Sequence, residues 1–305
     1  MSRLFILAFS FAFLFIFNSC DKDEYFIEEL VNVVAYEEYE IVGKIGIKIS
    51  KYMDQSAGGY VQGAACYGDY LFQFLDSNTA VNIYNLRKKD YVETVEMVPI
   101  KSNHCNNASF SSFFYNGTDE FPLLYVSGDS SSYNHVQVYR IIKVGDSFTF
   151  VQIQEITLPK ATKENNLYWS GVILDNDNNC MYIYANSNGA QIAKLNIPDI
   201  NQKEVVLTDE DIMEQYTLEK FTHQQGAVIY KGMMYVFDGV PQWGDTNYLR
   251  IIDLEKKVDF AKINITGKGL KAEPEGAFIY KDVLCCATNN SGIYKVELKL
   301  DYLYE

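Results

Sequence analysis

The sequence lacks the features that mark nucleic-acid-binding proteins and the common hydrolases. Its 26 Lys and Arg residues are outnumbered by 40 Asp and Glu residues, which gives a net charge of −14, and no basic run interrupts this excess. Because nucleic-acid binding depends on basic side chains that neutralise phosphates, this balance excludes nucleic acid as an expected partner. No GxSxG, HExxH or Asp-box signature occurs, so the motifs leave the catalytic residues, and any reaction, unknown.

Metal-binding cysteine patterns are also missing. Neither a CxxC pair nor a Cys/His spacing typical of zinc sites occurs. Five cysteines follow Cys20, an odd number that cannot pair completely, and most lie in or beside strand-like apolar segments. Since a free cysteine behaves as a small apolar residue, we expect these side chains to fill the core.

Long apolar runs are absent after residue 17, where nothing approaches the roughly 20 residues that span a bilayer. The exception lies at the start, where Arg3 precedes an apolar run over 4–17 that ends in "FNSC". A basic residue, an apolar stretch and a small residue before the cleavage point are typical of a signal peptide. The segment resembles a bacterial lipoprotein signal, although Phe17 and Asn18 replace the usual aliphatic and small residues. The resemblance implies that Cys20 is lipidated.

The residues after Cys20 read "CDKDEY" and resemble those of surface-exported lipoproteins of Bacteroidetes, which carry a basic residue and two acids here. This resemblance implies a signal peptide over 1–19 and a lipidated, acidic tether over 20–36. It also implies an outer-membrane lipoprotein exposed at the cell surface, whose membrane contact is the lipid anchor.

One short phrase recurs five times, as "VQGAAC", "NNASFS", "WSGVIL", "QQGAVI" and "PEGAFI", at intervals of 45 to 63 residues. Each phrase begins an apolar strand that is followed by turns and further strands. Fixed spacing with several strands per unit is typical of radial repeats. The sequence therefore predicts an all-β fold, a five-bladed β-propeller over residues 37–305.

The last repeat has only three strands, which would leave an unpaired sheet edge. Residues 40–50 alternate between apolar and mostly polar positions and predict a strand that closes the ring from the N-terminal side. In the third blade we expect the outer strand at 203–208. Thr208 and the three acids after it predict a short helix over 208–220.

Polar residues at the start of each phrase are the candidate site. The first strand of a propeller blade lines the central channel, so these residues should converge at one mouth of the ring. The expected ligand is a small polar molecule or a glycan, held by these residues and by aromatic, histidine and acidic neighbours. Glu273 and Glu275 are the candidate metal ligands. The full set is Gln62, His104, Asn107, Trp169, Ser170, His223, Gln225, Trp243, Glu273 and Glu275.

Two resemblances leave enzymatic alternatives open beside non-enzymatic recognition. The phrase "PEGA" at 274–277 is similar to one in propeller lactonases, whose channel Glu and Asn bind calcium, and implies a calcium-dependent hydrolase or lactonase. The phrases "VQGA" and "FTHQQGA" resemble "FTQGL" of the five-bladed glutaminyl cyclases and imply an acyltransferase of that kind.

Overall fold

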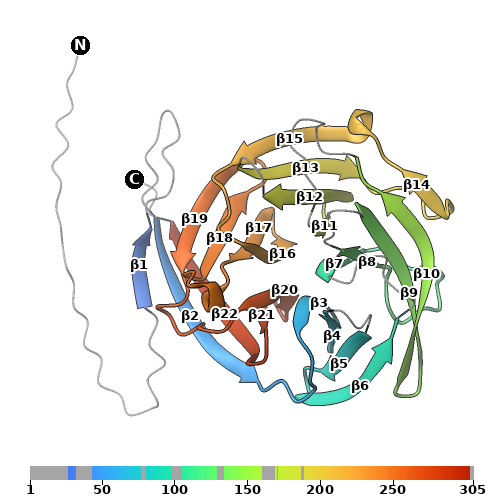
Figure 1. Ribbon diagram of the computed structural model, residues 1–305, viewed down its shortest axis with the longest axis horizontal. Helices are drawn as coiled ribbons and strands as arrows, with labels where there is room; N and C mark the ends of the chain where they lie inside the picture. Colours follow the sequence, from blue (N-terminus) through green and yellow to red (C-terminus); the bar gives the residue numbers. More distant parts are fainter. Residues whose placement is uncertain are drawn as a thin grey trace.

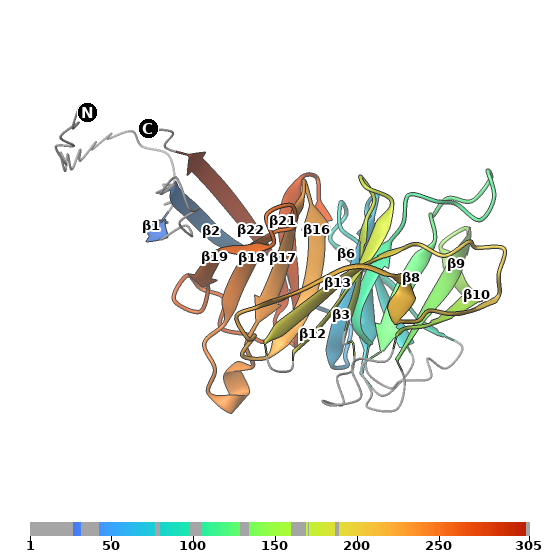
Figure 2. The ribbon, with the colours of Figure 1, turned by 90° about the horizontal axis from the view of Figure 1, so that it is seen from above.

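The computed structural model describes residues 27–31, 43–76, 80–97, 105–128, 134–159, 169, 171–186 and 189–302. Over these residues the chain forms five β-sheets arranged around a central axis (Figure 1). The edge-on view shows strands running across the thickness of the ring (Figure 2). Within the described ranges two single-turn 3-10 helices accompany the strands, and no helix there is long and apolar enough to cross a membrane. The predicted all-β, five-bladed propeller is confirmed.

Each blade begins with an inner strand that contains the repeated phrase or most of it. These strands are β3 (Val61–Tyr67), β7 (Cys105–Phe110), β11 (Gly171–Asp175), β16 (Gln224–Tyr230) and β20 (Pro274–Tyr280). Neighbouring inner strands contact one another around the ring, and β20 contacts β3 to complete it (Figure 1).

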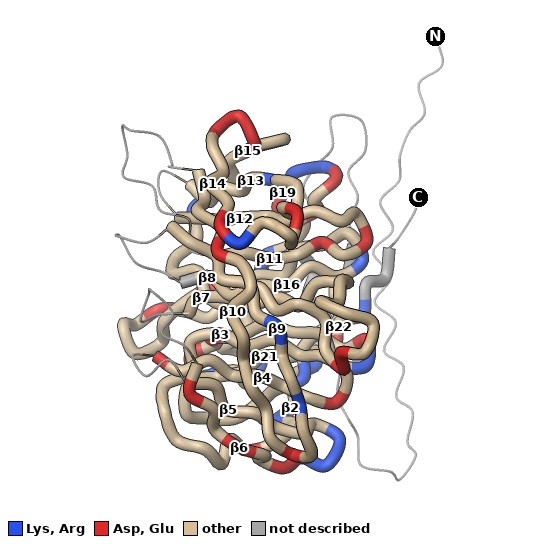
Figure 3. Tube along the Cα trace, turned by 90° about the vertical axis from the view of Figure 1, so that its right-hand side faces the viewer, with Lys and Arg blue, Asp and Glu red and all other residues tan. Residues whose placement is uncertain are grey.

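The outer strands of the first four blades follow in antiparallel order, with one long connection in the third blade. Their bounds are β4 (Tyr70–Leu75), β5 (Ala80–Asn85), β6 (Asp90–Glu96), β8 (Leu124–Gly128), β9 (His135–Val144), β10 (Ser147–Thr157), β12 (Cys180–Asn186), β13 (Ala190–Asn196), β15 (Ile212–Leu218), β17 (Met233–Asp238), β18 (Tyr248–Asp253) and β19 (Val258–Asn264). Acidic residues lie along β6 and in the turn before β15, whereas the inner strands carry few charges (Figure 3).

The fifth blade is closed from the N-terminal side, as the alternation over 40–50 predicts. After β21 (Val283–Thr288), strand β22 (Gly292–Tyr302) pairs with β2 (Gly43–Met53) in an antiparallel register. Ile45 and Ile47 of β2 are buried in a cluster that also contains side chains of the fourth blade. The closing strand therefore completes the last sheet and packs it against its neighbour.

A further strand, β1 (Ile27–Val31), pairs with β2 at the edge of this sheet. It lies within residues 20–36, which the resemblance to surface lipoproteins predicts to be a tether. The remaining residues of that segment, Cys20 included, lie outside the described part of the chain.

Two expectations for the third blade are wrong. Strand β14 (Glu204–Val206) pairs in parallel with β10 of the second blade, and β15 is the outer strand of the third. Thr208 does cap a turn, because its backbone N–H and hydroxyl donate to Asp211, but only one 3-10 turn (η1, Asp209–Asp211) forms. Residues 212–218 alternate between half-buried and exposed, a period of two that fits a strand paired with β13.

The glycines of the repeated phrase are required by the closeness of the inner strands. A Cβ atom on Gly226 would lie 2.6 Å from the backbone nitrogen of Ala277, and one on Gly276 would lie 2.4 Å from the Cβ atom of Ala64. Real Cβ atoms essentially never approach another atom within 3.0 Å. Adjacent blades are therefore packed backbone against backbone at these positions, where a side chain has no room.

Gly226→Ala should destabilise the protein by about 2 kcal/mol or more, because overpacking a tightly packed core typically costs about 1–3 kcal/mol. The measurement is urea unfolding of both proteins, with the midpoint and slope fitted together. Gly117→Ala is the matched control, since a Cβ atom there meets nothing within 4 Å. Equal midpoints for the two variants would contradict the close packing.

Candidate functional site

β-bulges turn polar side chains of the inner strands toward the mouth of the ring. The pairing register shifts between Val61 and Gly63 in β3, between Cys105 and Asn107 in β7, and between Pro274 and Gly276 in β20. Strand β16 has an equivalent shift between 224 and 227. A bulge leaves one residue unpaired and re-aims its side chain. Because the bulges coincide with the repeated phrase, the polar residues of different blades point to one place.

These side chains line a cavity of about 550 Å³ at the channel mouth. Amide side chains dominate its wall, with two aromatic residues, one histidine and three acids. The lining residues are Tyr60, Gln62, Asp76, Asn106, Asn186, His223, Gln224, Gln225, Val240, Gln242, Trp243, Glu273, Glu275 and Asn289. The structure thus brings together six residues of the sequence-derived set: Gln62, His223, Gln225, Trp243, Glu273 and Glu275.

Two residues of that set are placed elsewhere, and two are not described by the structure. Trp169 is 3% exposed and packs in the core between the second and third blades, where its Nε1–H donates to the carbonyl of Pro159. Asn107 is fully buried and does not line the cavity. His104 and Ser170 lie outside the described residues.

The residue of the second blade that corresponds to Gln62 is Asn106, one position before the predicted Asn107. Asn106 is the bulged residue and lines the cavity, whereas Asn107 stands where the other blades have glycine. Its amide lies between three blades: Nδ2–H donates to the carbonyl of Val172 at 2.7 Å, and Oδ1 accepts from the N–H of Ala227 at 3.2 Å. Asn107 is therefore a structural bridge at the centre of the ring.

Residues after the second strand of several blades contribute the part of the wall that the phrase does not contain. Asp76 follows β4, Asn186 ends β12 and Asn289 follows β21. All three are polar and stand at the end of the second strand of their blade or directly after it, and this position is the signal by which they could be found in the sequence.

Glu275 is the least solvated polar group of the site. Its side chain is 1% exposed, lies against the cavity, and its Oε1 has no hydrogen-bond partner among the described residues. Burial raises the pKa of this carboxyl well above its ordinary value of 4.5, and the neighbouring acid Glu273 raises it further. Glu275 is thus a buried carboxylic acid that can donate its proton toward Glu273.

Glu273 is held by three amide groups. Its Oε1 accepts from Nε2 of Gln225 at 3.4 Å, and its Oε2 accepts from Nδ2 of Asn289 at 3.2 Å and from Nε2 of Gln242. These donors come from the inner strand and a loop of the fourth blade and from the fifth blade. The two acids are therefore fixed relative to both blades.

His223 stands at the rim with a carboxylate partner. Its Nδ1 lies 2.6 Å from Oδ2 of Asp245, which also accepts the backbone N–H of Val240 at 2.9 Å. With the carboxylate accepting from Nδ1–H, the Nε2 atom is left for the solvent or a ligand. The ring packs edge-on against Trp243, whose centroid is 4.9 Å away.

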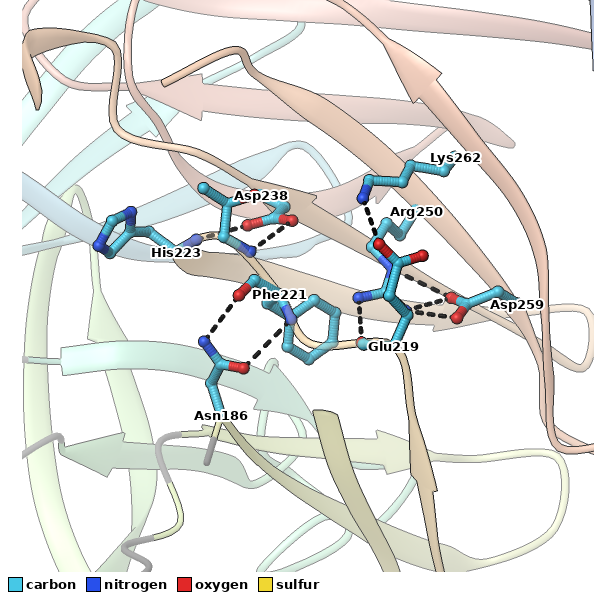
Figure 4. Close-up of polar contacts among 9 residues, drawn as sticks. Asn186, Glu219, Phe221, His223, Asp238, Arg250, Asp259 and Lys262 are labelled. Atoms are coloured by element: carbon cyan, nitrogen blue, oxygen red, sulfur yellow. Dashed lines mark hydrogen bonds and ion pairs between the residues drawn. The ribbon is translucent and has the colours of Figure 1, made fainter. Parts of the chain in front are cut away.

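The segment before β16 is held by paired backbone contacts, which set the position of His223 (Figure 4). The carboxylate of Asp238 accepts the backbone N–H groups of Thr222 and His223 at 3.0 and 2.7 Å. One residue earlier, the backbone of Phe221 forms two hydrogen bonds with the Asn186 side chain of the third blade. The rim is therefore tied to two blades.

A buried arginine anchors the start of the same segment (Figure 4). Arg250 is fully buried, donates to both oxygens of Asp259 at 2.5 Å and to the backbone carbonyl of Glu219 at 2.7 Å, and lies over the ring of Phe221. A buried charge is tolerated when its donors are satisfied in this way. The carboxylate of Glu219 in turn accepts from Lys262 at 2.9 Å.

Among the residues that the structure describes, no three His, Cys, Asp or Glu side chains come together in a geometry that would hold a metal ion. Glu273 and Glu275 are therefore not part of such a cluster in the described part of the chain.

Glu275→Gln should stabilise the protein increasingly as the pH rises above about 4.5, the ordinary pKa of the group. Below that pH, Glu275 is protonated in both states. Above it, the unfolded chain loses the proton while the folded protein keeps it, so wild-type stability falls by up to about 1.4 kcal/mol per pH unit until the raised folded pKa is reached.

Urea unfolding of wild type and variant at pH values from about 4 to about 8 measures this difference. Glu255→Gln, at an exposed turn, is the control and should show no such trend. A stability difference for Glu275→Gln that is constant across the range would show that the group is not retained in its protonated form.

No family model and no curated protein matches the chain. Among solved structures, the glutaminyl cyclase of Myxococcus xanthus superposes with a TM-score of 0.52 at 9% identity, over 85% of this chain and 97% of that one. A Bacteroides thetaiotaomicron protein of unknown function gives 0.47 at 14% identity, over 84% and 76%. Virginiamycin B lyase of Staphylococcus aureus, in an inactive form with quinupristin, gives 0.42 at 11%, over 82% and 99%. At these identities the first match shows a shared propeller fold.

Proposed function

We propose that this protein binds a small polar ligand, such as a saccharide, in the cavity at the mouth of the propeller. The observation that carries the proposal is Glu275: a fully buried carboxyl group that faces the cavity with an oxygen lacking a partner among the described residues. An unsatisfied buried polar atom costs about 1–3 kcal/mol. A ligand that hydrogen-bonds this oxygen recovers that cost.

The composition of the wall supports a ligand rich in hydroxyl or amide groups. Side-chain amides both donate and accept, as sugar hydroxyls do. Trp243 is 70% exposed beside the cavity and offers a flat apolar surface to the C–H face of a sugar ring.

A second candidate is cyclisation of an N-terminal glutamine, with release of ammonia, favoured by the fold shared with a glutaminyl cyclase. Glu275 has the chemistry that such a step needs. A buried carboxyl with a raised pKa keeps its proton to higher pH than a solvated carboxyl does, and can deliver it to a leaving group.

Titration of the purified propeller with mono- and disaccharides, free amino acids and glutaminyl peptides tests both functions, with Trp243 fluorescence as the binding signal. Trp243 and the buried Trp169 are the two tryptophans of the chain. The Trp243→Phe variant lacks this fluorescence signal, so its binding is measured by calorimetry. Glu275→Gln should weaken binding at least about tenfold, while Glu255→Gln should not.

Mass spectrometry of the glutaminyl peptides decides between the candidates. Loss of ammonia from the peptide with wild type, abolished in Glu275→Gln, would establish cyclisation. Binding without turnover leaves recognition as the function. Absence of binding by every compound would count against the ligand site itself.

We also propose that the protein acts as an outer-membrane lipoprotein at the bacterial cell surface, anchored through Cys20. This rests on the "FNSC" segment and the acids after it. Cys20→Ala should abolish labelling with a radioactive fatty acid and move the protein from the detergent phase to the aqueous phase. Unchanged partitioning of the variant would contradict the anchor.

A further inference from the structure

The charge of the cavity is one-sided. Three acids, Asp76, Glu273 and Glu275, lie in its wall, and no Lys or Arg is among the described residues that line it. The one basic group there, His223, is already engaged by the carboxylate of Asp245. An anionic ligand would meet repulsion in this cavity, whereas a cation would meet favourable charge from more than one blade.

Glu275 points to a cation independently of this acidic cluster. Its side chain is 1% exposed, and its Oε1 has no partner among the described residues although it lies against the cavity. Burial and the adjacent acids Glu273 and Asp76 disfavour its charged form. A positive group placed at Oε1 would supply both the missing hydrogen-bond donor and the missing counter-charge, and would remove that cost.

The rim carries the second element of cation recognition. Trp243 and Tyr60 are 70% and 62% exposed, and both line the cavity. Exposed aromatic side chains over an acidic cavity provide negative ring faces, which attract ammonium groups. Trp243 ends the 3-10 turn Pro241–Trp243 and packs edge-on against the ring of His223.

We propose that the ligand of this cavity carries a protonated amine, which enters between the rim aromatics and donates to Glu275 with Asp76 nearby. This inference rests on the proposed ligand-binding function and narrows it to one chemical class. An amino sugar and the free N-terminus of a short peptide both present this group. Acetylation of the amine removes the charge and blocks the interaction.

Matched ligand pairs test the proposal. Glucosamine is compared with N-acetylglucosamine, and alaninamide with N-acetylalaninamide, so that each pair differs in the charge of one nitrogen. Trp243 fluorescence or calorimetry gives the dissociation constants, at about 0.15 M salt, where a Debye length of about 8 Å screens the remote acidic surface. The sugar pair and the peptide pair distinguish the two sources of the amine.

The amine of at least one pair should bind wild type at least about tenfold more tightly than its acetylated partner. Glu275→Gln and Asp76→Asn should each reduce this preference, and the surface variant Glu255→Gln should leave it intact. Asp76→Asn keeps the test valid if changing Glu275 disturbs the fold, since Asp76 is only half-buried.

Three results would overturn the inference: equal or tighter binding of the acetylated forms, an amine preference that survives both cavity variants, or no binding by either amine. Equal or tighter binding of the acetylated forms would contradict the amine but would still support a ligand site, with a neutral ligand. In the last case the neutral saccharides of the earlier titration decide separately whether the cavity binds any ligand.

Discussion

The close approach of the five inner strands is the constraint on which the rest of the molecule depends. Gly226 and Gly276 leave no room for a side chain, so neighbouring blades meet backbone to backbone near the axis. Asn107 stands at the equivalent place in the second blade, and there its amide links the third and fourth blades. The centre of the ring is thus packed at this level. Polar groups one residue earlier have no space inward and turn to the mouth, which the bulges permit.

The same constraint explains why a poorly solvated carboxyl group lies at the mouth. Glu275 precedes Gly276, so its carboxyl is fixed where water has little access. Glu273, two residues before it, is fixed by amides from the fourth and fifth blades. A purely structural role would also require polar groups at the strand ends. An amide at position 275 would make the same contacts without the cost of desolvating a second acid. A carboxyl kept at this cost supports the proposed ligand site.

The sequence predicts the blade number, the ring closure and most strands, because hydrophobic alternation and repeat spacing are local properties. It predicts six of the cavity residues for the same reason. For the second blade it predicts the cavity residue one position too late, at Asn107. This offset becomes visible only when the glycine position of the repeat is recognised as a packing requirement. It also favours a helix after Thr208, because capping residues act locally, whereas pairing with β13 selects a strand for 212–218. Long-range pairing, such as that of β14 with β10, has no local signal.

Glu275, at the floor of the cavity, and His223, at its rim, are held in place by different interactions. Glu275 depends on the packing of β20 against its neighbours. His223 depends on the segment that runs from the Arg250 anchor to the carboxylate of Asp238. That segment is tied to the fourth blade by a buried charge whose donors are satisfied. A preformed rim and a preformed floor would reduce the ordering cost of the proposed binding, which favours selective recognition of a small ligand with few contacts.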